Sequence, residues 1–416
     1  WLESFSANRG IFIFGNRYMK AKSLVLQQGA DRRLRGGHVW IYSNEVDNKA
    51  SPLKNFEVGE QVQVVDSQGR PRGSAIINPN TLICGRLFSR DPEQELDRSL
   101  IVHRLNIALS LREMSFDQPC YRLVYGDSDG LPGLVIDRYY DIFVVQISTA
   151  GMEKVQHHVI DALNKVFMPA AIVLRNDGKF RETEGLEAYV EVVQGEVGDL
   201  SPLSENGVNL VAPLLTGQKT GWFYDHRENR ARMQTMVKGK KVLDLFSYVG
   251  GWGAQALAAG ASEVACVDAS AGALEVAEEN ARLQNALPKF RALQGDAFDI
   301  CKTLVADKER FDVVIVDPPA FIMRKKDIRN GERAYARINN FAMRLLKRGG
   351  VLVSASCSMH LQTDRLVDML RTNSRELDRQ GQIFAQGYQG ADHPIHPAIP
   401  ETEYLKAYFM RLLANE

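Results

Sequence analysis

The spacing of hydrophobic and polar positions changes twice along the chain, which predicts three domains. Between residues 20 and 90 it gives short strand-like runs, KSLVLQ, HVWIYSNEV, EQVQVVDSQGRPRGSAIIN and LICGRLFS, broken by the turn signals GG, DSQG and NPN. This spacing predicts a small, mostly β barrel. Between 94 and 210 the pattern mixes helices at about 97–114 and 152–166 with strands paired around a turn at Asp141, which predicts an α+β domain. A hairpin then leads into the polar segment TGQKTGWFYDHRENR.

From residue 240 onward, apolar strand-like runs alternate with helical patterns. The runs are KVLDLFS, EVACVDA, FRALQ, FDVVIVDPP and GVLVSASC. Such alternation predicts an α/β fold built from right-handed βαβ units, with a parallel sheet covered by helices on both faces. Ligands of such sheets bind outside the carboxyl ends of the strands. Candidate chemistry is therefore sought at those ends.

These changes of pattern set the expected boundaries. The β domain is expected at 19–92, the α+β domain at 93–215 and the α/β domain at 216–416. Residues 1–18 are expected to be an upstream or expression-derived extension, with Met19 as the natural start, because IFIFG is too short for the apolar region of a signal peptide.

Composition narrows the classes of protein that remain. The 416 residues hold 51 Lys and Arg against 51 Asp and Glu, so no global field draws the protein to nucleic acid or to an anionic membrane. No apolar run approaches the ~18 residues of a membrane span. The five cysteines are scattered and have no metal-ligand spacing, which predicts reduced thiols, no metal site and a cytoplasmic location.

Acidic residues stand at the ends of four successive predicted strands. Asp244 lies in the first, followed by the glycine-rich turn SYVGGWG, which alone would equally suit a dinucleotide. Asp268 ends the second strand, where a carboxylate can accept hydrogen bonds from ribose hydroxyls. Asp296 follows the third, in a position suited to an adenine amino group, and Asp317 ends the fourth, in VIVDPPAF. Four such acids in register indicate a nucleoside-containing cofactor.

The ordered set VLDLFSYVGGWG, VACVDAS, LQGDAF and VIVDPPAF resembles the class I S-adenosylmethionine-dependent methyltransferases. The chain is most similar to the bacterial 23S rRNA cytosine-5 methyltransferase family of the RlmI type, through GQKTGWFYDHRENR, SCS at 356–358, GADHP and PETEYLK. This resemblance covers essentially everything after Met19. It implies an N-terminal PUA domain, a central α+β domain and a Rossmann-like catalytic domain. The sequence departs from comparable enzymes at Ala320, where they often carry Lys.

The resemblance gives Cys357 a chemical role. Carbon 5 of cytosine is a poor nucleophile, and addition of a thiolate to carbon 6 converts the ring to an enamine that can attack a methyl group. Cys357 stands at the carboxyl end of the fifth strand, and Ser356, Ser358 or nearby amides are candidates for favouring its thiolate. The resemblance implies that Asp317 contacts the edge of the cytosine and that Glu401, just before the last strand, is the base that removes the proton from carbon 5.

The same resemblance implies the binding partners, S-adenosylmethionine and either 23S rRNA or an assembly intermediate of the large subunit. The residues expected to hold the cofactor are Lys219, Tyr224, Asp244, Phe246, Tyr248, Gly250, Gly251, Asp268, Asp296, Ala297 and Asp317. The residues expected to contact RNA are Arg32, Arg33, Arg35, His38, Trp40, Arg227, Phe321, Arg324, Lys325 and Lys326. The basic cluster before Trp40 also fits a solvated turn ahead of a core tryptophan.

Three other functions stay open at this point. A methyltransferase of the same fold could modify a base nitrogen, and Cys357 would then be dispensable. A non-catalytic RNA-binding protein could keep the cofactor fold as a scaffold, although it would not need the acids at the strand ends. A nucleotide-dependent oxidoreductase would have no use for DPP or SCS. The oligomeric state is also open, with a homodimer as one option.

Overall fold

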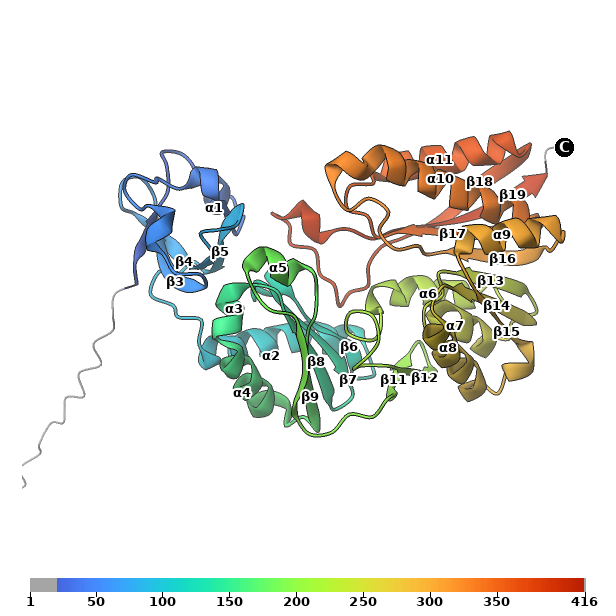
Figure 1. Ribbon diagram of the computed structural model, residues 1–416, viewed down its shortest axis with the longest axis horizontal. Coiled ribbons are helices and arrows are strands. Elements are labelled where there is room, and N and C mark those ends of the chain that lie inside the picture. Colours follow the sequence, from blue (N-terminus) through green and yellow to red (C-terminus); the bar gives the residue numbers. More distant parts are fainter. Residues whose placement is uncertain (1–20, 415–416) are drawn as a thin grey trace, which may run out of the picture.

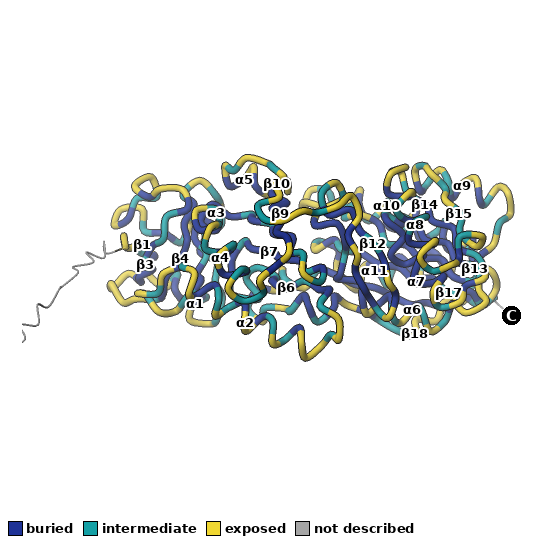
Figure 2. Tube along the Cα trace, turned by 90° about the horizontal axis from the view of Figure 1, so that it is seen from below, coloured by how far each residue is buried: buried dark blue, intermediate teal, exposed yellow. Residues whose placement is uncertain are grey.

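The computed structural model of the protein describes residues 21–414. The predicted extension at 1–18 and the predicted start at Met19 lie outside the described residues. Three bodies follow one another along the long axis of the molecule, in the order of the sequence (Figures 1 and 2). No helix of residues 21–414 is both long enough and apolar enough to cross a membrane.

The first body is a five-stranded sheet in the order β1-β3-β4-β5-β2. Its strands are β1 (Ser23–Val25), β2 (Trp40–Tyr42), β3 (Glu60–Val65), β4 (Pro71–Ile77) and β5 (Ile83–Ser89). They enclose a core that includes Leu24, Ile41 and Val64. The predicted strands are thus confirmed, while the basic sequence before Trp40 forms a single helical turn, α1 (Arg32–Arg35).

The second body is an α+β domain with a sheet in the order β10-β9-β8-β7-β6. The strands are β6 (Cys120–Tyr125), β7 (Leu134–Tyr139), β8 (Ile142–Ile147), β9 (Ala171–Asn176) and β10 (Tyr189–Gln194). Its helices are α2 (Arg98–Ser115), α3 (Ala150–Lys154), α4 (Gln156–Phe167) and α5 (Phe180–Glu184). The predicted helix at 152–166 is interrupted at Val155, and the predicted β-turn joins β7 to β8. The hairpin β11 (Ser201–Glu205) and β12 (Val208–Ala212) follows.

The third body carries a seven-stranded sheet in the order β15-β14-β13-β16-β17-β19-β18. The strands are β13 (Lys241–Leu245), β14 (Glu263–Asp268), β15 (Phe290–Gln294), β16 (Phe311–Val316), β17 (Leu346–Ser356), β18 (Arg379–Gly387) and β19 (Lys406–Ala414). The first five run parallel, as predicted. Strand β19 enters between β17 and β18 and runs antiparallel to both.

Side chains alternate between the two faces of the sheet along each strand, and both faces of this sheet are apolar. Helices therefore cover both of them. Leu243, Leu245 and Val314 pack on one face beneath α9 (Ala297–Ala306), α10 (Ile328–Leu345) and α11 (Thr363–Glu376). Val242 and Val313 pack on the other, beneath α6 (Arg227–Gln234), α7 (Gly251–Ala258) and α8 (Ala271–Leu283). The predicted double coverage is confirmed.

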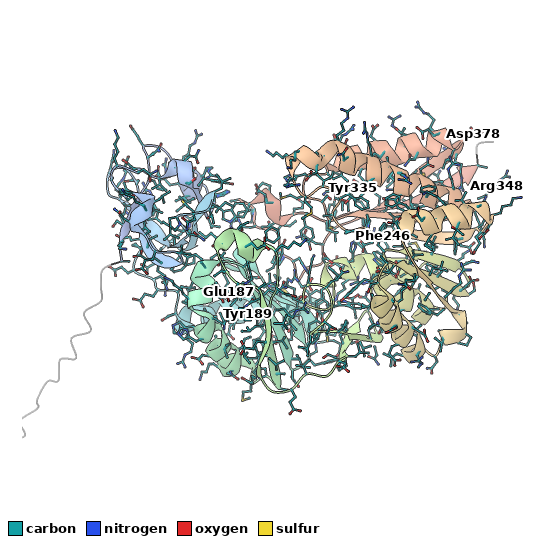
Figure 3. The ribbon with its side chains drawn as sticks, viewed as in Figure 1. Glu187, Tyr189, Phe246, Tyr335, Arg348 and Asp378 are labelled. Atoms are coloured by element: carbon teal, nitrogen blue, oxygen red, sulfur yellow. The ribbon has the colours of Figure 1, made fainter. Side chains whose placement is uncertain are left out.

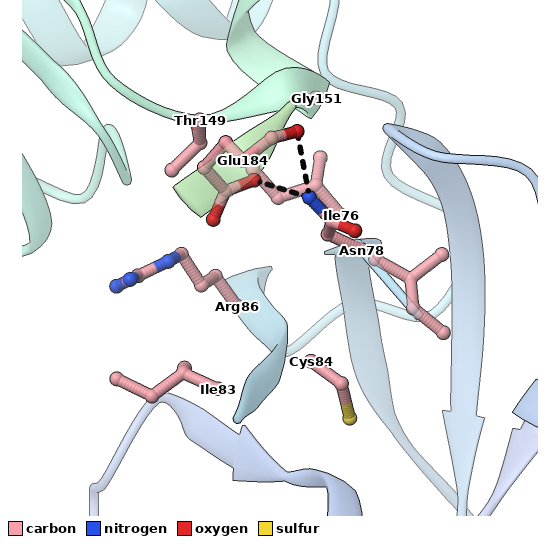
Figure 4. A pocket seen from close by; sticks show the side chains of 9 residues that line it. Ile76, Asn78, Ile83, Cys84, Arg86, Thr149, Gly151 and Glu184 are labelled. Carbon is pink, nitrogen blue, oxygen red and sulfur yellow. Dashed lines mark hydrogen bonds between the residues drawn. The ribbon is translucent and has the colours of Figure 1, made fainter. Parts of the chain in front are cut away.

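Polar contacts join the three bodies. Between the first two, the Asn78 amide donates to the backbone and side chain of Glu184, in a seam also lined by Cys84 and Arg86 (Figure 4). Between the second and third, Asp137 is completely buried and accepts hydrogen bonds from Arg122 and from the hydroxyl of Thr220. The third body is therefore joined to the second just before β13, the first strand of its sheet.

Replacing Asp137 by Asn should destabilise the protein by about 3–5 kcal/mol, because it leaves the Arg122 guanidinium without its buried counter-charge. Urea denaturation followed by tryptophan fluorescence measures the loss. Asp368→Asn is the matched control: its carboxylate, 46% exposed, pairs with Arg365 on the surface, and no measurable change is expected. Equal midpoints for the two variants would contradict this assignment.

Candidate active site

The turn after β13 has an unusual backbone. Phe246, Tyr248 and Gly250 all have positive φ angles, of 62°, 49° and 74°. Left-handed conformations are unfavourable for bulky residues and collect at functional sites. The Tyr248 amide donates to a carboxylate oxygen of Asp268 at 2.8 Å, which ties this turn to the end of β14. The turn predicted from SYVGG therefore lies where the first two strands end.

The glycines of this turn permit close packing of the protein with itself. A Cβ on Gly250 would lie 2.8 Å from the Cβ of Ala277, and one on Gly253 would lie 2.6 Å from Cys266 Sγ. A Cβ on Gly251 would meet the ring of Trp222 at 3.1 Å. These distances explain why α7 can begin directly above the sheet. These glycines thus seat the helix against the sheet, and the predicted contact of Gly250 and Gly251 with the cofactor stays a prediction.

Unpartnered buried polar atoms gather at the carboxyl ends of the strands. Asp244 Oδ1, Ser247 Oγ and Asp225 Oδ1 are buried and have no hydrogen-bond partner among residues 21–414. Such atoms are rare in folded proteins because each costs free energy. Burial, together with the nearby charge of Asp317, raises the pKa of Asp244 to about 8. A positively charged or hydrogen-bonding ligand would relieve this arrangement.

The other predicted cofactor residues lie beside these atoms. Asp268 accepts from the amides of Tyr248 and Ser270. Asp296 caps α9 by accepting from two amides through Oδ1, and Ala297 follows it as the buried first residue of that helix. Both carboxylates stand at the tips of adjacent parallel strands, β14 and β15. This places two acceptors along one edge of the sheet, as the sequence predicts.

Asp317 is held by two groups from other elements. Its Oδ1 lies 3.0 Å from His226 Nε2, and its Oδ2 accepts from the Trp252 indole at 3.0 Å. Burial disfavours both charges, but the ion pair outweighs it, lowering the pKa of Asp317 and raising that of His226. The side chain of Asp317 is still 22% exposed. An ionised carboxylate is thus fixed at the end of β16 with part of its surface open.

Cys357 follows β17, directly beside Asp317 on β16. Its Sγ lies 4.0 Å from the carbonyl oxygen of Pro318, which immediately follows that aspartate. Cys357 is partly exposed, whereas Cys84, Cys120, Cys266 and Cys301 are at most 1% exposed. Burial raises the pKa of the Cys357 thiol to about 11, Lys219 opposes this, and Asp317 and Asp225 add to it. The surroundings of this thiol therefore decide whether it reacts.

The two serines beside Cys357 hold the backbone. The hydroxyls of Ser356 and Ser358 both bond the hydroxyl of Tyr335, which is fully buried on α10. The Ile322 amide also donates to Ser358 Oγ. Neither serine hydroxyl bonds the sulfur among the contacts of the described residues, so the expectation that these serines favour the thiolate is replaced by one in which they fix its position. Figure 3 shows Tyr335 within the catalytic body, in the same region as Phe246.

A segment before β13 supplies Asp225 and His226, which the sequence prediction did not assign, together with Lys219, which it assigned to the cofactor. Asp225, 6% exposed, lies in the short helix η4 (Tyr224–His226) and accepts from the Tyr404 hydroxyl at 2.6 Å. Its charge acts on the thiol of Cys357. Lys219 Nζ lies 4.7 Å from the centre of the Phe223 ring, and its charge reaches both Asp225 and Cys357. The sequence run KTGWFYDHRENR indicated that this segment matters, and it contains both Asp225 and His226. That these two side chains face the strand ends follows only from the fold.

Three predicted residues interact with the first or central domain. Tyr224 is 1% exposed and donates its hydroxyl to the carbonyl of Arg138, so its side chain is occupied by the interface with the central domain. Arg227 is buried against the same domain and donates to the Cys120 carbonyl. Glu401 is exposed, and its charge raises the pKa of His38 in the first domain against the stronger effect of burial. The loop carrying Glu401 extends toward that domain (Figure 1).

The predicted RNA-contacting residues form two separate groups. In the first domain, Arg33 pairs with Glu45, Arg35 pairs with Asp31, and the Trp40 indole donates to Asp127 of the central domain. Arg32 and His38 lie beside them, with Arg32 exposed. In the catalytic body, Phe321 packs 4.8 Å from the Tyr335 ring, centroid to centroid. The exposed residues Arg324, Lys325 and Lys326 follow it.

Comparison with known proteins gives this arrangement a family. A family model described as S-adenosylmethionine-dependent methyltransferase matches residues 178–381, and one described as PUA-like domain matches 24–90. Proteins named ribosomal RNA large subunit methyltransferase I from Erwinia tasmaniensis and Escherichia coli are each 35% identical over 94% of this chain and 99% of their own length. The chain belongs to the ribosomal RNA large subunit methyltransferase I family. This confirms the predicted recognition and the predicted enzyme class.

Solved structures show the same fold as this member of the methyltransferase I family. A methyltransferase solved as a complex with SAH (S-adenosylhomocysteine) matches with a TM-score of 0.80 over 94% of this chain and 100% of its own, at 18% identity. An S-adenosylmethionine-dependent methyltransferase from Streptococcus mutans matches over the same shares, also at 18% identity, with a TM-score of 0.79. The predicted Rossmann-like class I methyltransferase fold is confirmed.

The strand ends of this methyltransferase fit S-adenosylmethionine. Asp244 Oδ1 and Ser247 Oγ are buried acceptors without partners, which suits a ligand that carries positive charge and hydrogen-bond donors. Asp268 and Asp296 present carboxylates toward the edge where a nucleoside would lie. No group of three or more potential metal ligands occurs among residues 21–414.

Replacing Asp244 by Asn should stabilise the cofactor-free protein while weakening its affinity for S-adenosylmethionine. The folded-state pKa is about 8 against an ordinary value of 3.8. The native state therefore holds this proton more tightly than the unfolded chain, and stability is lost as the pH rises from about 4 toward 8. Asn does not titrate, so the variant does not lose this stability as the pH rises, and its side-chain oxygen can still accept a hydrogen bond from the Gly253 amide. The melting temperature of the variant should exceed that of the wild type by on the order of 5 °C at pH 8.

The difference should shrink at pH 5, where wild-type Asp244 is protonated. Thermal denaturation at both pH values measures it, and calorimetric titration with S-adenosylmethionine gives the affinity. A melting temperature that falls equally at both pH values would contradict the proposed protonation of Asp244.

Proposed function

We propose that the protein methylates carbon 5 of a cytosine in 23S rRNA, with Cys357 as the nucleophile. The observation that carries the proposal is the position of Cys357: a half-buried cysteine directly after β17, on the strand next to β16, which the ionised Asp317 follows. Methylation of a base nitrogen or of a ribose oxygen needs no thiol at this place. Relatives named for the large ribosomal subunit support rRNA as the substrate, and rRNA as substrate supports a cytoplasmic location.

The chemistry follows from the groups around the thiol. S-adenosylmethionine supplies an electrophilic methyl group. The Cys357 thiolate adds to carbon 6 of the cytosine, and the ring electrons displaced to carbon 5 form the new bond to the methyl carbon as its bond to the sulfonium sulfur breaks and S-adenosylhomocysteine leaves. A base then removes the proton from carbon 5, and the electrons of that C–H bond restore the 5,6 double bond as the bond between sulfur and carbon 6 breaks. In this proposal, Asp317 accepts a hydrogen bond from the cytosine amino group.

Two carboxylates are candidates for the base. Glu401 is favoured by its place before the last strand, but it is exposed and its charge acts on His38 of the first domain. Asp225 is buried, has an unpartnered Oδ1, and acts electrostatically on Cys357. Its pKa is held below the ordinary value by His226, His393 and Lys219, which outweigh its burial, so the carboxylate is ionised at neutral pH. These facts favour Asp225 as the acceptor of the proton.

The substrate base must leave its stack before carbon 6 is reachable, at a cost of a few kcal/mol. Contacts to the RNA backbone compensate this cost. Arg324, Lys325 and Lys326 are exposed before α10 and follow Ile322, whose amide donates to Ser358 Oγ of the SCS segment, and Arg32 is exposed on the first domain. Two basic surfaces on separate bodies would hold RNA on either side of the thiol. A homodimer remains a prediction that this arrangement does not require.

Cys357→Ala should abolish methyl transfer to unmodified 23S rRNA, with a fall of at least about 10³-fold, because no other group can add to carbon 6. The assay uses labelled S-adenosylmethionine and nucleoside analysis of the product. Cys301→Ala, which removes a thiol from the core beneath α9, is the matched control and should keep most of the activity.

The wild type should also release tritium from RNA labelled at carbon 5 of its cytosines, in step with methyl transfer. Product on a base nitrogen, or full activity of Cys357→Ala, would overturn the proposal. In that case the enzyme would be a nitrogen methyltransferase of the same fold. An absence of any methyl transfer by wild-type protein to free rRNA or to large-subunit particles would favour the non-catalytic RNA-binding alternative.

Asp225→Asn should accumulate a covalent adduct between the protein and methylated RNA, because the thiol can still add but the proton on carbon 5 cannot leave. A denaturing gel with labelled RNA detects this adduct. Glu401→Gln is the matched control and should turn over without adduct. The reverse pattern would assign the base to Glu401, and weakened RNA binding without adduct in Asp225→Asn would leave Asp225 as a hydrogen-bond acceptor only.

A further inference from the structure

We infer that Lys406 is a positioning residue that stabilises the thiolate of Cys357 from beneath the SCS segment. The inference rests on the proposed nucleophilic role of Cys357. It adds a side chain from β19, the antiparallel strand that pairs with β17 at the end of the five parallel strands.

Lys406 is brought to the thiol by the pairing of β17 with β19. The register places it opposite Ser356, the residue before Cys357. Its Nζ donates to the carbonyl oxygen of Ser358 at 2.8 Å, on the other side of the cysteine, and to that of Tyr404 at 3.0 Å. A lysine ammonium has three N–H donors. One of them holds the backbone next to Cys357, one holds the backbone of the segment that leads into β19, and the third has no partner among the contacts of the described residues.

Burial makes this lysine an unusual choice for a structural role. Lys406 is only 9% exposed, and buried lysines are rare unless they are paired. No carboxylate forms an ion pair with it among residues 21–414. Burial lowers its pKa, while the charges of Cys357 and Glu403 raise it. A thiolate at Cys357 supplies the negatively charged partner that Lys406 otherwise lacks.

The thiol and the amine therefore share protons as a coupled pair. The neutral pair, thiol with amine, and the charged pair, thiolate with ammonium, hold the same number of protons. Moving one proton from Sγ to Nζ converts the first into the second. Each partner lowers the cost of charging the other, so the reactive thiolate becomes accessible without a separate base.

Several other charged groups face this pair. Lys219, from the segment before η4, lowers the pKa of Cys357, while Asp317 and Asp225 raise it. Tyr335 approaches from α10, and burial raises its pKa to about 12, so it is neutral. Lys219 is exposed on a loop. Lys406, in contrast, belongs to β19 and is held within the sheet itself.

The test is the pH dependence of Cys357 alkylation by iodoacetamide in the full-length, cofactor-free protein. Peptide mass spectrometry isolates Cys357, and the other four thiols are buried. Lys406→Gln can keep a hydrogen bond to the backbone but removes the charge. It should shift the midpoint of the profile upward by about one pH unit, which is roughly a tenfold loss of rate at pH 7.5. Lys406→Arg keeps the charge and should restore most of the rate.

Lys241→Gln is the matched control, because Lys241 lies at the amino end of β13, on the opposite edge of the sheet, and its loss should leave the profile unchanged. The reciprocal measurement needs no lysine variant: NMR titration of 13C-labelled lysines should show a lower pKa for Lys406 in Cys357→Ala than in the wild type. Lys406→Gln with a wild-type profile, or a Lys406 titration unaffected by Cys357→Ala, would overturn the inference.

These outcomes are distinct from a failure of the proposed function. If Cys357→Ala still methylates rRNA, the covalent mechanism fails whatever the alkylation profile shows. If Cys357→Ala is inactive but the profile of Lys406→Gln is unchanged, the thiol is the nucleophile and Lys406 only supports the backbone.

Discussion

The ion pair between His226 and Asp317 is the interaction on which the catalytic centre depends. It joins η4, which lies outside the parallel sheet, to the end of β16 within it. Because η4 is fixed in this way, the adjacent Asp225 faces the strand ends. The same segment is anchored behind by Arg230, which pairs with the buried Glu205. The site thus lies between the sheet and the segment that contains η4, and neither part alone contains the full set of charges.

The groups of this site act on the pKa of the Cys357 thiol in opposite directions, and the chemistry can use this balance. Two carboxylates, Asp317 and Asp225, raise the pKa of the Cys357 thiol, and burial raises it further, to about 11. The charge of Lys219 and a backbone hydrogen bond at Cys357 lower the pKa of the thiol, and the inferred coupling to Lys406 acts in the same direction. A site of this kind keeps the thiol protonated and unreactive toward solvent. Charge that arrives with the ligands would shift the balance at the moment when a nucleophile is needed, because each nearby positive charge favours the thiolate.

Much of the fold could be predicted because local patterns determine it. Alternating apolar runs identified the strands from β13 to β17, and a parallel sheet necessarily brings Asp244, Asp268 and Asp317 to one edge. Cys357 could be placed beside Asp317 by the same logic. The roles of Asp225 and Lys406 could not, because they depend on the packing of η4 against the sheet and on the antiparallel entry of β19. Glu401 was chosen by its sequence position, but its loop extends to the first domain.

The two serines of SCS show a second limit of prediction from the sequence. Their sequence position suggested help to the thiol, whereas their hydroxyls bond Tyr335 from α10. A side chain's partner is set by whichever helix covers the strand, and sequence spacing does not report it. The basic residues of α1 show the same limit, since Arg33 and Arg35 find carboxylates within their own domain.

The most direct test of the covalent mechanism is to incubate the protein and S-adenosylmethionine with 23S rRNA containing 5-fluorocytidine. Fluorine at carbon 5 leaves no proton for the base to remove, so the methylated adduct cannot resolve. The mechanism predicts a stable protein–RNA complex whose cross-linked peptide contains Cys357, as mapped by mass spectrometry. Methylation of normal rRNA together with no covalent complex on the fluorinated RNA, or a cross-link at another residue, would contradict it.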